Sequence, residues 1–256
     1  VDRLVRTKVR GRPDGRLQFF ISGGAALNPE IGNFFMALGI NLLQGYGQTE
    51  ASPLISANRP GKIKIETVGP VVAGVDLKIA ADGEILVRGD LLMKGYWRDD
   101  AATSAVIQDG WLHTGDLGEV DADGFITITG RKKDIIVNSG GDNIAPGRVE
   151  ALLTIEPEIE QAMVDGDKRP WLAAVIVPSE EVRSLASSPD ALATMVGEAV
   201  ERANSRLSQL ERVRRFIIAD EAFSTENGQM TATLKVRRHI VGALYRDRLD
   251  ALYPEK

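Results

Sequence analysis

Residues 67–130 consist of short stretches in which apolar and polar side chains alternate, broken by glycine and aspartate. This alternation is typical of half-buried strands, and the turn DADG at 121–124 joins two of the stretches. Because a helix needs apolar residues roughly three to four positions apart, the pattern favours hairpins of an antiparallel sheet. We therefore predict an antiparallel β subdomain, or small barrel, over residues 67–130.

The residues before this subdomain have the pattern of a strand, a helix and a second strand. The apolar runs LQFFISGG at 17–24 and INLLQGYG at 40–47 both end in glycine, as buried strands that lead into turns do. Between them, Asn28 and Pro29 form the expected start of a helix, a cap followed by proline at its first position. We predict that residues 1–66 are the C-terminal piece of an α/β nucleotide-binding subdomain, because ligands of parallel sheets lie at such turns.

Residues 131–256 are predicted to form a compact α+β domain. A hairpin at 161–178 is closed by the turn GDKRP, and a further strand is expected at 216–220. Apolar residues at helical spacing predict one helix within residues 190–210 and a last helix that carries Ile240, Val241, Leu244, Tyr245, Leu249 and Leu252. We place the boundary near Gly130, where the charged run RKKD separates two strand-like segments.

Composition narrows the class of partner. The 36 acidic and 31 basic residues give a formal charge of −5, which argues against a nucleic-acid groove. The absence of cysteine excludes disulfides and thiolate metal sites and fits a reducing compartment, and no apolar run is long enough to span a bilayer. We therefore expect small-molecule substrates, no nucleic acid and a cytoplasmic location; peripheral membrane association and oligomer formation stay open.

The motif GYGQTE at 45–50 sets an aromatic ring between two glycines at the end of a predicted strand. Adenine can stack on the ring of Tyr46, Thr49 offers a hydroxyl to a phosphate oxygen, and Glu50 offers a carboxylate to Mg²⁺. The structural alternative is a tyrosine that closes a strand, followed by a threonine cap and an acidic first helical turn.

Two further motifs contribute charged side chains to the candidate site. In HTGD at 113–116 we expect Asp116 on a tight turn, where its carboxylate can accept hydrogen bonds from both hydroxyls of a ribose. Arg131 in GRKKD follows a strand that carries Ile128, and its guanidinium suits ribose or phosphate oxygens. An ordinary turn aspartate and a solvated charged turn are the alternatives. His113 is expected to be a structural or loop residue.

A lone lysine lies ahead of the last predicted helix. Lys235 follows the stretch TENGQMTAT at 225–233, which has few apolar residues. A lysine on such a loop can neutralise charge that develops on a transferring group. It can equally be a surface lysine beside Arg237 and Arg238, and its spacing does not decide between the two.

In their order, these motifs resemble the C-terminal half of the adenylate-forming acyl-CoA synthetase superfamily, as do GEILVRG, the GYW that follows it and the glycine-rich SGGDNIAP. SGGAAL at 22–27 and TATLKVRR at 231–238 look most like the long-chain fatty acid:CoA ligase branch. The resemblance covers nearly the whole chain. It implies that a fatty acid reacts with ATP and Mg²⁺ to give an acyl-adenylate and pyrophosphate, and that coenzyme A then takes the acyl group.

The resemblance also implies a fold and a set of site residues. The fold is α/β plus α+β, the remnant of a large adenylation domain followed by a mobile C-terminal domain that rotates about Lys133. Thr49, Glu50 and Lys235 would be catalytic, with Mg²⁺ on Glu50 and adenylation served by Lys235. Contacts to the adenylate would come from Gly24, Ala25, Gly45, Tyr46, Gly47, Thr49, Asp116, Ile128 and Arg131. After the rotation, Ser139, Gly140 and Gly141 would replace the lysine and border the pantetheine tunnel.

The sequence departs from the family pattern in three places. The phosphate-binding loop rich in glycine, serine and threonine is absent from these 256 residues, and no GxxxxGK[ST] motif replaces it. Because the chain also starts at Val1, we expect a piece of a longer enzyme that is inactive alone. Arg148 stands where the family commonly has glutamate, and Ala232 where long-chain members often have proline. Two alternatives are a ligase or adenylation domain that delivers to a carrier protein and a non-catalytic nucleotide-binding fragment.

Overall fold

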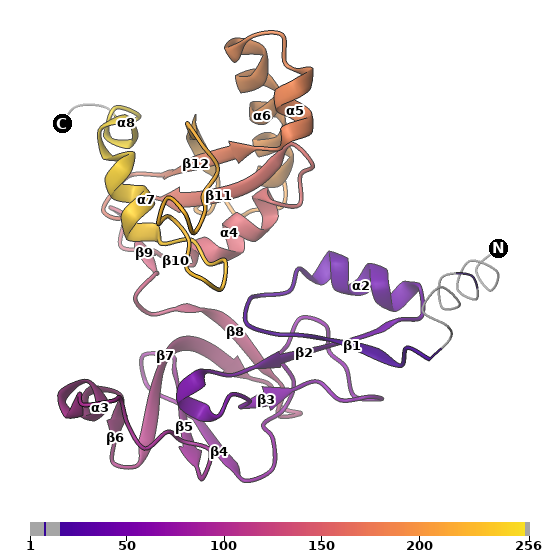
Figure 1. Cartoon of the computed structure of the whole chain (residues 1–256), viewed down its shortest axis with the longest axis vertical. Helices are drawn as coiled ribbons and strands as arrows, with labels where there is room; N and C mark the ends of the chain where they lie inside the picture. The colour runs from indigo at the N-terminus through magenta and orange to yellow at the C-terminus, as the bar shows by residue number, and fades with distance from the viewer. Residues whose placement is uncertain (1–7, 9–15, 254–256) are drawn as a thin grey trace. The chain divides into compact units, whose positions relative to one another are not determined.

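The computed structural model describes residue 8 and residues 16–253, and it divides the chain into two compact units, 1–133 and 134–256 (Figure 1). Both units mix helices with sheets, as the α/β plus α+β prediction requires. The basic segment 1–15, apart from residue 8, lies outside the described residues. Each unit is described by itself below.

The first unit begins with the predicted strand, helix and strand, but the first strand is mostly exposed rather than buried. β1 (Phe19–Ser22) pairs in parallel with β2 (Asn41–Tyr46), and α2 (Pro29–Ala37) connects them (Figure 1). The side chain of Asn28 accepts a hydrogen bond from the backbone N–H of Glu30 at 2.8 Å, which confirms the predicted cap. Because the two strands are parallel, the loops that follow them leave the same edge of the sheet. A short third strand, β3 (Ser56–Ala57), runs antiparallel to β2.

An antiparallel sheet forms the rest of the first unit. Its strands are β4 (Val75–Ile79), β5 (Glu84–Gly89), β6 (Ile107–Gln108), β7 (Trp111–Val120) and β8 (Ile126–Arg131). The order is β4-β5-β7-β6, and β8 pairs with β7. Helix α3 (Asp100–Val106) precedes β6 and is capped by Asp99. The hydrophobic core of the sheet contains buried Ile55, Ile85, Val87, Leu112 and Ile126. The alternating sequence therefore folds into the antiparallel sheet that it predicts.

The second unit is built around one central strand that is buried along its whole length. That strand is β12 (Leu172–Pro178), which runs antiparallel to β11 (Ile159–Asp165) and parallel to β13 (Val213–Ile218). Alternate residues of β12 belong to two hydrophobic clusters, which explains why its sequence is continuously apolar.

Helices cover both faces of this sheet (Figure 1). One cluster includes residues of α4 (Pro146–Leu153) and α6 (Pro189–Asn204), and the other includes residues of α7 (Arg238–Leu244) and α8 (Arg246–Asp250). A further helix, α5 (Glu180–Leu185), follows β12, and the short hairpin of β9 (Ile136–Val137) and β10 (Asn143–Ile144) precedes α4. The predicted α+β pattern of this unit is therefore present.

The prediction of one continuous last helix is wrong. The backbone leaves the helical conformation at Tyr245, with φ of −100° and ψ of 12°, so that α7 and α8 are separate. The ring of Tyr245 is buried, and its hydroxyl accepts a hydrogen bond from the backbone N–H of Asp220 at 2.9 Å. The helix thus breaks at a residue, Tyr245, that is buried and hydrogen-bonded to another segment, and the spacing of apolar residues does not reveal this break. Within the described part of the chain, no helix has both the length and the apolar character needed to cross a membrane.

Candidate active site

Three side chains from two segments of the chain meet at Asp116, whose side chain is 13% exposed. The hydroxyl of Tyr46, the last residue of β2, donates a hydrogen bond to its Oδ2 at 2.7 Å. Gln48 Nε2 donates to the same oxygen at 2.6 Å, and Arg131 Nε lies 3.3 Å from Oδ1. The structure therefore brings together Tyr46, Asp116 and Arg131, which come from three separate motifs. Their roles toward a ligand stay predictions.

Asp116 does not lie on a tight turn, so that prediction is wrong. It lies inside β7, where a bulge interrupts the pairing with β5. Glu84 pairs with Leu117 and Leu86 pairs with His113, so residues 114–116 of β7 lie opposite a single residue of β5. The bulge contains Gly115 at φ of 70°, a conformation that glycine adopts without strain. The glycine in HTGD thus signals a bulge within a strand rather than the end of one.

The bulge is held by side chains of neighbouring segments. Gln48 Nε2 donates to the backbone O of Thr114 at 2.8 Å, and Glu84 Oε1 accepts a hydrogen bond from the backbone N–H of Gly115 at 2.9 Å. The hydroxyl of Thr114 donates to the backbone O of Ile85 at 2.8 Å. Backbone groups that leave the ladder at the bulge are therefore satisfied inside the protein, which fixes the conformation around Asp116.

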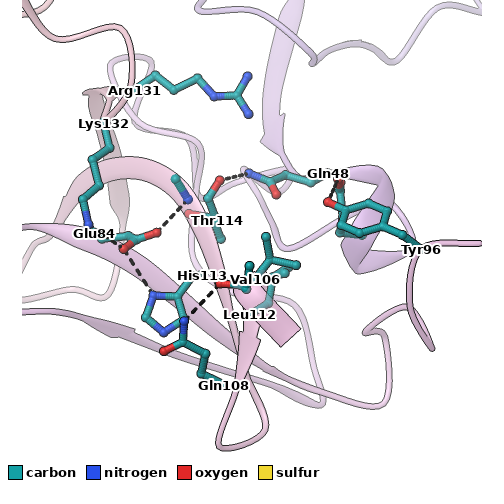
Figure 2. A pocket seen from close by; sticks show the side chains of 13 residues that line it. Gln48, Glu84, Tyr96, Val106, Gln108, Leu112, His113, Thr114, Arg131 and Lys132 are labelled. Atoms are coloured by element: carbon teal, nitrogen blue, oxygen red, sulfur yellow. Dashed lines mark hydrogen bonds and ion pairs between the residues drawn. The ribbon is translucent and has the colours of Figure 1, made fainter. Parts of the chain in front are cut away.

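Glu84 is a buried carboxylate next to this bulge, with a side chain that is 7% exposed. Lys132 Nζ lies 3.1 Å from its Oε2 and His113 Nδ1 lies 3.3 Å from the same oxygen, so that Glu84 is placed between them (Figure 2). Burial opposes ionisation of this carboxyl. The hydrogen bonds from Gly115 N–H, Lys132 and His113 outweigh it and lower the pKa of Glu84 below its ordinary value.

A pocket of about 440 Å³ opens beside Glu84 (Figure 2). It is lined by Gln48, Glu50, Glu84, Tyr96, Ala105, Val106, Gln108, Leu112, His113, Thr114, Gly115, Arg131 and Lys132. Two of these, Glu50 and Arg131, are predicted site residues. The hydroxyl of Tyr96 donates to Oε1 of Glu50 at 2.8 Å, and this hydrogen bond, with burial, raises the pKa of Tyr96. Glu50 thus faces the pocket with its carboxylate held at one oxygen.

Packing within the chain requires a glycine at position 47 and leaves little room for a side chain at Gly45. A Cβ on Gly47 would lie 1.7 Å from the backbone O of Pro53, and one on Gly45 would lie 3.2 Å from Cδ1 of Leu54. Gly47 thus allows a close approach of the segment that follows, while the contacts of Gly45 and Gly47 with the adenylate stay predictions. Thr49 and Glu50 belong to the short 3₁₀ helix η1 (Thr49–Ala51), which begins directly after the turn.

The remaining predicted adenylate contacts lie at the edge of the first unit's sheets. Gly24 and Ala25 follow β1 in an exposed loop, and Gly24 has φ of 83°. Ile128 is partly buried on β8 and packs against the same hydrophobic cluster as Tyr46. Tyr46 and Ile128 therefore border one apolar region, whereas Gly24 and Ala25 have no described side-chain contact with it.

The predicted residues of the second unit lie in two loops. Ser139, Gly140 and Gly141 lie between β9 and β10, where Oδ1 of Asn138 accepts hydrogen bonds from the N–H groups of Gly140 at 2.8 Å and of Asp142 at 2.9 Å.

Lys235 is exposed in the loop before α7. Its backbone N–H donates to the hydroxyl of Thr231 at 3.1 Å, and its backbone O accepts from Thr231 N–H at 2.8 Å. The preceding residue, Leu234, has φ of 58°. The backbone of this loop is thus closed on itself while the lysine side chain stays exposed.

Sequence reasoning missed Gln48, Glu84 and Tyr96. All three lie within motifs that the sequence presents, GYGQTE, GEILVRG and GYW, but local spacing assigns them no partner. Their contacts span 68, 31 and 46 positions, respectively, to Asp116, Gly115 and Glu50. The contact of Glu84 depends on the register of β5 against β7, and the other two depend on how segments distant in the sequence pack together.

Comparison with known proteins gives two family matches. Residues 2–97 match the family described as AMP-binding enzyme, and residues 133–256 match the AMP-binding enzyme C-terminal domain. The chain is 41% identical over 268 residues to long-chain-fatty-acid–CoA ligase FadD15 of Mycobacterium bovis, covering 98% of the chain and 44% of that protein. It is 33% identical to long-chain-fatty-acid–[acyl-carrier-protein] ligase AEE15 of Arabidopsis thaliana, covering 91% of the chain and 35% of that protein.

Solved structures give the same picture. The adenylation domain of a carboxylate reductase from Mycobacterium chelonae superimposes with a TM-score of 0.82 at 26% identity, covering 98% of the chain and 41% of that structure. The o-succinylbenzoate CoA synthetase of Bacillus subtilis, in complex with its acyl-adenylate intermediate, gives 0.73 at 26% identity, covering 92% and 49%. The chain spans less than half the length of the curated relatives described above.

Proposed function

Because the chain belongs to the AMP-binding enzyme family, we propose that it supplies the adenylate-binding part of an ATP-dependent long-chain fatty acid:CoA ligase. In this reaction the fatty acid carboxylate attacks the α-phosphorus of ATP, and pyrophosphate leaves. The thiol of coenzyme A then attacks the carbonyl carbon of the acyl-adenylate, and AMP leaves. The name and identity of the mycobacterial relative support the substrate class.

The contact between Tyr46 and Asp116 carries the proposal. Its hydrogen bond fixes the tyrosine ring from its hydroxyl end and leaves the aromatic face as a surface for adenine. Asp116 accepts two hydrogen bonds at Oδ2, whereas Oδ1 contacts only the partly exposed Arg131 among the described side chains. We assign Oδ1 to the ribose hydroxyls and the guanidinium of Arg131 to ribose or phosphate oxygens, because both are charge-assisted contacts.

Mg²⁺ is assigned to Glu50. Within the described residues there is no cluster of three or more histidine, cysteine, aspartate or glutamate side chains that would form a complete metal cage. One carboxylate together with phosphate oxygens is the ligand set that Mg²⁺ prefers, and Glu50 fits it because Tyr96 engages only its Oε1. Bound Mg²⁺ would neutralise charge on the phosphates. Thr49, the residue before Glu50, would contact a phosphate oxygen.

Two loops of the second unit are assigned to the two steps of the reaction, adenylate formation and thioester formation. We propose that Lys235, exposed on its loop, contacts the adenylate during its formation, and that the loop of residues 139–141 takes its place during thioester formation. Lys133 is the proposed hinge between these arrangements. A backbone that turns at a few positions suffices for such a change. A cytoplasmic location, favoured by the cysteine-free composition, belongs to the same proposal.

A carrier protein is the second candidate acceptor. The Arabidopsis relative is named as an acyl-carrier-protein ligase, while the mycobacterial relative of higher identity is named as a CoA ligase. An assay that offers long-chain acyl groups to coenzyme A and to a phosphopantetheinylated carrier protein separates the two. We expect the CoA thioester as the main product, and transfer only to the carrier would contradict that choice of acceptor.

The catalytic assignment is tested in an enzyme that joins residues 1–256 to the part of the mycobacterial relative that precedes the matched region. Lys235→Ala should abolish acyl-adenylate formation yet spare thioester formation from a supplied acyl-adenylate. Arg237→Ala, which removes an exposed charge from the same loop, is the control and should affect neither step. Two results would refute the proposal. One is an equal loss of adenylate formation and thioester formation in Lys235→Ala, and the other is a joined enzyme without the substitution that releases no pyrophosphate in response to fatty acid.

A further inference from the structure

The bulge in β7 leaves Gly115 with a backbone N–H that has no partner in the sheet ladder. Residues 114–116 lie opposite one residue of β5, and the pairing resumes only at Leu117. An unsatisfied N–H in a partly buried position is costly, so its partner decides whether the bulge holds its shape. That partner is Oε1 of Glu84 at 2.9 Å.

Glu84 also reaches the neighbouring strand. Its Oε2 is 3.1 Å from Nζ of Lys132, the residue after β8, while the backbone N–H of Lys132 donates to the backbone O of Gly115 at 2.8 Å. Asp116 and Arg131 are register partners across β7 and β8. Glu84 therefore contacts Gly115, the residue before Asp116, and Lys132, the residue after Arg131.

The bond to Gly115 distinguishes Glu84 from nearby carboxylates. Asp82 also accepts from Nζ of Lys132, at 2.6 Å, so Lys132 keeps an acidic partner without Glu84. Asp82 is about half exposed and has no bond to the bulge among the described contacts. A methionine would fill about the same buried volume as Glu84 but would offer Gly115 only a weak thioether acceptor, and a leucine would offer none.

We infer that Glu84 is a positioning residue: by accepting the Gly115 N–H, it sets the direction in which Asp116 presents its carboxylate to the ribose. This inference rests on the proposed function. Glu84 does not touch the nucleotide in this scheme and acts through the bulge. Its loss therefore weakens recognition of the ribose hydroxyls more than the contacts to base and phosphate.

The test compares the affinities of the full 256-residue chain for AMP and for 2′,3′-dideoxy-AMP by calorimetry. In the wild type we expect AMP to bind about tenfold more tightly, because the dideoxy compound lacks the hydroxyls that Asp116 would hold. Glu84→Met should bring the ratio of the two dissociation constants close to one. Glu84→Gln, which keeps an oxygen acceptor for Gly115, should retain most of the ratio. Asp82→Ala removes a partner of Lys132 and of the Glu84 backbone N–H but no bond to Gly115, and it should also retain the ratio.

A ratio in Glu84→Met equal to that of the wild type would overturn the inference while the proposed function stands. A wild-type chain that binds AMP and the dideoxy compound equally would overturn the proposed function and this inference with it. Glu84→Asp provides the same comparison if Glu84→Met does not fold, since it keeps the charge but shortens the reach to Gly115. Its ratio should fall at least severalfold, and an unchanged ratio would again refute the positioning role.

Discussion

The hydroxyl of Tyr46 donates a hydrogen bond to Oδ2 of Asp116 at 2.7 Å, although the two residues are 70 positions apart in the chain. Burial and the carboxylate of Asp116 raise the pKa of Tyr46 far above its ordinary value of 10.0, so the phenol keeps its proton and remains a donor even in mildly alkaline solution. Together with the hydrogen bonds from Gln48 to Asp116 and to the backbone of Thr114, this hydrogen bond joins the GYGQTE and HTGD motifs into a single site. It also fixes the ring in the orientation that the proposed stacking of adenine requires.

Substitutions at Tyr46 should separate its ring from its hydroxyl. Tyr46→Phe keeps the stacking surface and should weaken AMP binding only about threefold, whereas Tyr46→Ala should weaken it by tenfold or more, because stacking of a base contributes about 1–3 kcal/mol. Calorimetric titration of the full chain measures both effects. Equal affinities of Tyr46→Ala and wild type would show that adenine does not stack here.

The hydrogen bonds of Glu84 to Gly115, Lys132 and His113 should make the free energy of unfolding depend on pH in the acid range. The pKa of Glu84 is lowered in the folded state from an ordinary value of 4.5, so its contribution is fully present above pH 4.5 and is lost as the pH falls through the folded-state pKa. Urea unfolding of the wild type should therefore show a steeper loss of stability below pH 4.5 than unfolding of Glu84→Gln. Parallel pH profiles for the two proteins would contradict the lowered pKa.

The local pattern of the sequence predicted those features that need only neighbouring residues. The cap at Asn28 and the continuously apolar strand β12 are examples, because a cap and a two-sided strand leave a signature within a few positions. The location of Asp116 was predicted wrongly, since a glycine in HTGD is equally compatible with a turn and with a bulge. The bond between Glu84 and Gly115 depends on strand register, which the alternating pattern alone does not specify.

Arg238 should be a main contributor to the stability of the second unit. Its guanidinium donates to both carboxylate oxygens of Glu150, at 2.7 and 2.8 Å, and to the backbone O of Val164 at 2.8 Å, which connects α7 with α4 and β11. Arg238→Met leaves Glu150 without this partner and should lower the free energy of unfolding by about 3 kcal/mol. Arg237→Met, at an exposed neighbour, should change it by less than about 0.5 kcal/mol.

Urea titration monitored by circular dichroism measures this pair of variants. Arg238→Met and Arg237→Met with the same unfolding midpoint would show that the ion pair contributes nothing to the folded state.

Gly47 should tolerate no side chain, because a Cβ there would lie 1.7 Å from the backbone O of Pro53. We expect Gly47→Ala to destabilise the first unit by at least about 2 kcal/mol, since backbone on both sides must move. Gly147→Ala is the matched control: Gly147 lies in α4 with nothing within 4 Å of the new Cβ, and alanine should stabilise that helix by about 0.5–1 kcal/mol. Thermal unfolding of the two variants should shift in opposite directions, and a Gly47→Ala protein as stable as wild type would refute the packing explanation.

Asp116 is proposed to hold the ribose of an adenylate, and the AMP affinity of the full chain tests this role most directly. Asp116→Asn keeps the side-chain shape but removes the charge, so it should weaken AMP binding about tenfold or more. Asp123→Asn, in the exposed hairpin turn after β7, is the control and should bind AMP as the wild type does. A wild-type chain that binds AMP, together with an Asp116→Asn variant of equal affinity, would contradict the account.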